Sequence, residues 1–142
     1  MVVVDRLTKY AHFFALSHPF KASTVSTAFM ETIQNLHGNP KIIVSDRDSI
    51  FTGNFWTKLF SCLGTQLDHS SSYHPQSNGK TEIVNKCLEG YLRCFVSDKW
   101  TQWVKCFPLA KWWYNTSFHT ATKMTPFMAL YGYQPPFITS YL

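Results

Sequence analysis

The feature that most constrains the fold is the order of apolar segments, in which short strand-like runs alternate with helical patterns. Residues 2–4 and 10–16 are strand-like, and the turn-forming residues 5–9 join them. Apolar residues then recur at helical spacing over 23–37, and a short run of branched apolar residues follows at 41–45. A hairpin followed by alternating helices and strands predicts a mixed sheet flanked by helices, which is an α/β fold.

The rest of the chain continues this alternation. We expect a helix over 54–63, a strand over 65–69, a polar loop over 70–79 and a long helix over 81–96. Asn54 is the expected cap of the first of these helices. Later helices are expected at 100–115, interrupted near Pro108, and after Thr125-Pro126, where Gly132 ends the last one. No repeat or linker divides the chain, so residues 1–142 are expected to form a single domain.

The composition of the chain is compatible with a nucleic-acid partner but does not by itself identify one. Lys and Arg number 13 against 8 Asp and Glu, so the net charge is +5 and the pI is about 9.1. This charge suits a nucleic-acid partner and equally suits an ordinary basic surface. The four cysteines lack metal-site spacing and are interpreted as reduced core or helix residues, which predicts a nuclear or cytoplasmic location. No apolar run approaches the 18 or so residues of a membrane span.

Two carboxylates stand out. Asp46 directly follows the strand at 41–45, and catalytic groups gather beyond the carboxyl ends of strands in such sheets, although a turn-forming Asp is the simpler explanation. Glu82 begins the long helix, where the helix dipole alone would favour it. Helical spacing places Glu82, Asn85 and Lys86 on one polar face, which a solvated surface would also explain.

The two carboxylates together are more specific than either alone. Residues 47–81 separate them, which is 35 residues, and they lie in the strings IVSDRDSIFT (43–52) and YHPQSNGKTEIVN (73–85). With these strings, and with VVVDRLTKYAHF (2–13), WYNT (113–116) and TPF (125–127), the chain resembles the integrases of retroviruses and LTR retrotransposons. The resemblance is strongest to the Gypsy/Ty3 class and spans nearly the whole chain.

This resemblance implies a ribonuclease H-like catalytic core. Asp46 would be the second and Glu82 the third member of an Asp–Asp–Glu triad that binds Mg²⁺ or Mn²⁺. The implied activity is DNA integration by phosphoryl transfer, through 3′-end processing and strand transfer. Its implied partners are element-end and target DNA, contacted by Gln76, Asn85 and Lys86, and further copies of the chain.

The resemblance also implies that the front of the core is missing. In the family the first catalytic Asp lies on a central strand before the one at residues 2–4, so none is present in this chain. Asp5 matches the end of the next strand, and its expected role is to order the turn near Lys9. We therefore expect an N-terminally truncated core that is inactive as this fragment.

Two other functions stay open from the sequence. One is a non-catalytic DNA-binding or assembly module derived from a retroelement, and the other is a different ribonuclease H-like nuclease. Self-association, which the resemblance implies, has a candidate surface in an aromatic cluster, although core packing is the commoner role for such residues. The cluster consists of Trp100, Trp103, Trp112, Trp113 and Tyr114.

Overall fold

The computed structural model describes residues 1–70, 76–96 and 100–136, with the backbone alone at 76–80, 95–96 and 100–102. The chain divides into two compact units. The hairpin unit contains residues 1–15 and 81–142, and the parallel-strand unit contains residues 16–80. The described strands form two separate two-stranded sheets, one antiparallel and one parallel, and not the single mixed sheet that the sequence predicted.

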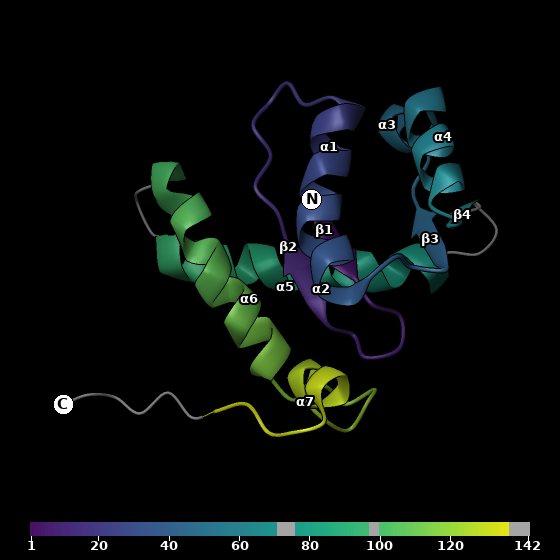
Figure 1. The fold of residues 1–142 in the computed structure, drawn as a ribbon. Helices are drawn as coiled ribbons and strands as arrows, with labels where there is room; N and C mark the ends of the chain where they lie inside the picture. The colour runs from purple at the N-terminus through teal and green to yellow at the C-terminus, as the bar shows by residue number, and fades with distance from the viewer. Residues whose placement is uncertain (71–75, 97–99, 137–142) are drawn as a thin grey trace. The chain divides into compact units, whose positions relative to one another are not determined.

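Strands β1 (Val2–Val4) and β2 (Ala11–Phe13) form the predicted hairpin (Figure 1). Asp5 orders its turn, because one carboxylate oxygen accepts hydrogen bonds from the backbone N–H and the hydroxyl of Thr8, at 2.7 and 2.6 Å. Burial alone would raise the pKa of Asp5, but these hydrogen bonds and the charge of Lys9 outweigh it and lower the pKa. The turn role predicted for Asp5 is confirmed.

Asn115 occupies the edge of β2 that faces away from β1. Its side-chain oxygen accepts from the N–H of Ala11 and its amide nitrogen donates to the carbonyl of Ala11, both at 2.8 Å. The backbone N–H of Phe14 donates to the carbonyl of Met1, and that of Asp5 donates to the carbonyl of Tyr10. Hydrogen-bonded and non-hydrogen-bonded pairs alternate along an antiparallel ladder, so the pair of Ala11 with Val4 is non-hydrogen-bonded. The N–H and carbonyl of Ala11 therefore point away from β1. The buried Asn115 amide thus replaces a neighbouring strand at this position.

The core of the hairpin unit lies between β2 and two helices. Helix α5 (Gln76–Val96) presents a buried stripe, and α6 (Phe107–Thr116) follows a 3₁₀ segment, η2 (Trp100–Cys106). Pro108 lies in the first turn of α6, which confirms the interruption expected there, because proline lacks the N–H that a continuous helix needs. The buried residues form two clusters. One contains Ala11, Val84 and Tyr114, and the other contains Leu88, Tyr91 and Ala110.

Helix α7 (Pro126–Tyr131) begins and ends as the sequence predicts. The hydroxyl of Thr125 accepts from the N–H of Met128 at 3.1 Å, and Gly132 ends the helix in the left-handed conformation with φ 78°. The helix packs on α6, where the rings of Trp112 and Phe127 lie 5.7 Å apart.

The parallel-strand unit pairs β3 (Ile42–Ser45) with β4 (Gln66–His69), which confirms both predicted strands. The expected helix at 23–37 is one continuous rod made of α1 (Ala22–Phe29), a π-helical turn (Met30–Gln34) and α2 (Asn35–His37). It ends at Gly38, whose φ of 76° suits glycine.

Helix α4 (Asn54–Cys62) packs on α1 and completes the core of this unit (Figure 1). The ring of Phe29 lies 5.3 Å from Phe60 and 6.3 Å from Trp56, both in edge-to-face contacts. Trp56 and Phe60 are almost completely buried. Buried aromatic side chains of this kind contribute large apolar areas to a core.

Two expectations about where helices begin are wrong in detail. Gly53, and not Asn54, is the cap of α4, because the short helix α3 (Ser49–Thr52) comes directly before it. The expected loop over 70–79 is helical from Gln76 onward, because the long helix tolerates Gly79. Residues 71–75 of that loop lie outside the described part of the chain.

Candidate metal and nucleic-acid site

Asp46 lies at the carboxyl end of β3, as predicted, and its side chain is exposed. Its Oδ1 accepts from the backbone N–H of Asp48 at 3.2 Å, which makes a tight turn. Asp48 in turn caps α3 by accepting from the N–H of Ile50 at 2.9 Å. Among the described residues no hydrogen bond engages Oδ2 of Asp46, so that oxygen is available to a ligand.

Ser45 and His69 lie beside Asp46 and were not singled out from the sequence. The parallel register pairs Ser45 with His69, and the Ser45 hydroxyl lies 3.3 Å from Nδ1 of His69. The same hydroxyl donates to the carbonyl of Asp46 at 3.1 Å. Residues at the ends of both parallel strands therefore contact the turn at Asp46. This contact depends on the register in which β3 and β4 pair, which the sequence alone does not show.

Glu82 lies in α5 on the solvent side, together with Asn85 and Lys86. Val84 and Leu88, on the opposite side of the helix, are buried. This arrangement confirms the polar face predicted from helical spacing. Among the described residues, no hydrogen bond or ion pair restrains Glu82 or Lys86.

The remaining predicted contact, Gln76, is the first residue of α5, and its side chain lies outside the described part of the structure. Asp46 belongs to the parallel-strand unit and Glu82 to the hairpin unit, so their convergence on one metal stays a prediction. Within the described residues, no group of three or more His, Cys, Asp or Glu side chains could hold a metal ion.

The chemistry of the two carboxylates fits a hard divalent cation. Both are exposed, and their oxygens are the ligands that Mg²⁺ and Mn²⁺ prefer. All four cysteines are free, as predicted. Cys62 lies in α4 and Cys94 in α5, which agrees with the predicted helix positions, and both are exposed. Across the described residues, no helix combines the length and apolar character needed to cross a bilayer.

The sequence is similar to retrotransposon polyproteins. It is 35% identical over 134 residues, 94% of the chain, to the transposon Tf2-3 polyprotein of Schizosaccharomyces pombe. The chain spans only about 10% of that relative's length. No protein-family model matches the sequence.

The fold is that of integrase catalytic cores. A chain of the simian T-cell lymphotropic virus intasome, solved with PP2A regulatory subunit B56 gamma, matches with a TM-score of 0.79 and 20% identity over 95% of this chain and 49% of that one. The HTLV-2 integrase catalytic core domain, solved in a trimeric form with magnesium, matches with a TM-score of 0.73 and 15% identity over 90% of this chain and 81% of that one. Both matches confirm the predicted ribonuclease H-like α/β fold.

Proposed function

Since this chain is a homologue of retrotransposon polyproteins with the fold of an integrase catalytic core, we propose that it is the integrase core of an LTR retrotransposon. Its reaction would be metal-dependent phosphoryl transfer that processes element ends and joins them to target DNA. The observation that carries the proposal is the exposed Asp46 carboxylate at the end of β3, with one oxygen free, in a chain of this fold.

Asp46 and Glu82 would hold Mg²⁺ in this proposal. Both supply carboxylate oxygens, and neither is engaged in an ion pair among the described residues. When bound, the cation stabilises the negative charge that develops on phosphoryl oxygens. The turn from Asp46 to Asp48, which Ser45 and His69 support, would orient the Asp46 carboxylate toward the cation. Oδ1 of Asp46 accepts within this turn, and Oδ2 would stay free to bind the cation.

DNA would lie along the exposed face of α5. Lys86 offers a cation for a phosphate, and Asn85 offers an amide that can donate to phosphate or to a base edge. Gln76, at the start of the helix, is the third proposed contact. Asn85 and Lys86 belong to the hairpin unit, whose charge suits DNA binding. This unit contains eight Lys and Arg against four Asp and Glu, whereas the parallel-strand unit contains five against four.

Paramagnetic broadening by Mn²⁺ tests whether the two carboxylates share a cation. We expect amide signals of residues 45–48 and 81–86 to broaden at the same Mn²⁺ concentration. Asp46→Asn and Glu82→Gln should each abolish both effects. Asp68→Asn is the matched control, because Asp68 is an exposed carboxylate on β4 that accepts from Gln66 at 2.9 Å.

Broadening at one segment alone, or broadening that survives Asp46→Asn, would refute the shared metal site. If the chain then still bound duplex DNA without metal, the non-catalytic DNA-binding module would be the better description. A metal-dependent hydrolysis of DNA without end joining would favour a different ribonuclease H-like nuclease.

We also propose that the chain self-associates through α6. Of the aromatic cluster, Tyr114 is buried and Trp112 packs on Phe127, whereas Trp113 and Trp103 are 43% and 36% exposed. The side chain of Trp100 lies outside the described part. Trp113→Glu should therefore lower the apparent mass in sedimentation velocity, and Phe118→Glu, at another exposed aromatic residue, is the control.

A further inference from the structure

Gly90 lies on the exposed face of α5, where none of the described residues packs closely against it. A Cβ added at this position would meet no atom of the described residues within 4 Å, so tight packing against them does not explain the glycine. A glycine inside a helix is destabilising relative to alanine, since it loses more conformational entropy on folding. A partner that approaches this face from outside would account for the glycine.

Lys86 and Arg93 flank Gly90 on the same face of the helix. The three positions follow the spacing i, i+4, i+7, which aligns side chains along one stripe. Both cations are exposed, and the stripe lies opposite the buried Val84 and Leu88. At 1.5 Å per residue, Lys86 and Arg93 are roughly 10 Å apart along the helix axis.

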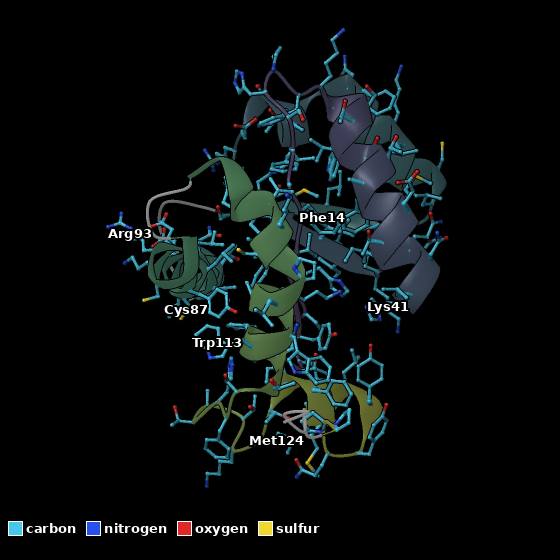
Figure 2. The ribbon with its side chains drawn as sticks, turned by 90° about the vertical axis from the view of Figure 1, so that its left-hand side faces the viewer. Phe14, Lys41, Cys87, Arg93, Trp113 and Met124 are labelled. Carbon is cyan, nitrogen blue, oxygen red and sulfur yellow. The ribbon has the colours of Figure 1, made fainter. Side chains whose placement is uncertain are left out.

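Glu82 and Glu89 share this face with the two cations, but neither forms an ion pair with them among the described residues. Among the described residues, no ion pair or hydrogen bond engages the Lys86 or Arg93 side chain. Figure 2 shows Arg93 on the side of α5 that faces away from α6. The position of Arg93 in the last turn also suits the helix dipole, but the dipole does not account for the glycine between the two cations.

We infer that Lys86, Gly90 and Arg93 form a track for the phosphate backbone of DNA, with Gly90 at the point of closest approach. This inference rests on the proposed function and extends the DNA contact about two helical turns beyond Lys86. Lys86 and Arg93 bind successive phosphates, and the bare backbone at Gly90 lets the sugar–phosphate chain lie against the helix. Arg93 and Gly90 thereby join Lys86 as DNA-binding residues of α5.

Fluorescence anisotropy with a short labelled duplex tests the track. Binding is measured without divalent metal from about 50 to 200 mM salt, where counterion release dominates affinity. Arg93→Gln should reduce the salt slope by about 1 and lower affinity roughly eightfold at 0.1 M salt. Lys105→Gln is the matched control, because it removes an exposed charge from the same unit outside α5.

Gly90→Ala separates binding from stability. It should raise the midpoint of thermal unfolding by roughly 3 °C, because alanine favours the helix, and yet weaken DNA binding several-fold. Glu89→Gln should strengthen binding, since it removes an exposed negative charge beside the track.

The outcomes distinguish the track from the proposed function. If Lys86→Gln reduces the salt slope while Arg93→Gln behaves like Lys105→Gln, the track is refuted and the proposed DNA contact at Lys86 stands. Unchanged binding by Gly90→Ala would overturn the role of Gly90. If the unaltered chain shows no salt-dependent binding, the proposed function fails together with the track.

Discussion

Replacing Asn115 by leucine tests the most buried polar contact of the hairpin unit. The Asn115 side chain is 1% exposed and makes two hydrogen bonds of 2.8 Å to Ala11. Leucine has nearly the same size but neither donates nor accepts, so the N–H and carbonyl of Ala11 would stay buried without partners. An unsatisfied buried polar group costs about 1–3 kcal/mol. We therefore expect Asn115→Leu to lower the free energy of unfolding by about 2–5 kcal/mol.

Equilibrium denaturation with urea measures this loss. Asn85→Leu is the matched control, because Asn85 is an exposed asparagine on α5 of the same unit. It should change the free energy of unfolding by no more than about 0.5 kcal/mol. A loss below about 1 kcal/mol for Asn115→Leu would refute the argument, since a single unsatisfied group already costs that much.

Asn115→Asp should make the free energy of unfolding depend on pH, which a simple loss of packing would not do. The N–H of Ala11 keeps its acceptor, but the carbonyl of Ala11 would face a carboxylate oxygen unless that oxygen carries a proton. Burial and this repulsion raise the pKa of the new carboxyl above about 3.9 in the folded state. The protonated form stabilises the fold fully below that value, and this stability is lost as pH rises through the folded-state pKa. A penalty that does not change between acidic and neutral pH, relative to the unaltered chain, would contradict this account.

Three smaller predictions concern the turn and the last helix. Asp5→Asn should lower stability at neutral pH by about 1 kcal/mol, because Thr8 donates to a charged, partly exposed carboxylate. The lowered pKa of Asp5 means that its contribution is present above 3.8 and is lost as pH falls through the folded-state value, so the difference from the unaltered chain should vanish in strong acid. Thr125→Ala should lower the free energy of unfolding by about 1 kcal/mol through loss of the cap on Met128, whereas Thr125→Ser should restore it. Gly132→Ala should cost about 1–2 kcal/mol because the φ of 78° disfavours a Cβ, and Gly90→Ala, in ordinary helix, is the stabilising control for both thermal and urea unfolding.

Local signals predicted most of the elements. The hairpin, both parallel strands, the change at Pro108 and the ends of α7 all follow from residues that act on their own neighbours, such as Thr125 and Gly132. The start of α5 at Gln76 cannot be predicted from the sequence, because small polar residues are common both in loops and in first helical turns. The short helix α3 was missed because its cap, Asp48, reads equally well as a turn residue.

The candidate site divides in the same way. Helical spacing was sufficient to place Glu82, Asn85 and Lys86 on one exposed face, since that face depends only on the period of the helix. The partners of Asp46 could not be found in this manner. His69 reaches Ser45 only because β3 and β4 pair in a particular register, across 24 positions of sequence.

The amino-acid sequence by itself determined where strands and helices form, because periodicity, caps and turn residues act within a few positions of one another. The tertiary structure alone decided which distant groups satisfy one another, as when Asn115 takes the place of a strand beside Ala11, 104 positions away. It also decided that the space beside position 90 is open, as far as the described residues reach. The Asn115–Ala11 contact and the open space beside position 90 both depend on how segments remote in sequence pack. Buried polar groups must find hydrogen-bond partners in space, and the room for a side chain is set by its spatial neighbours.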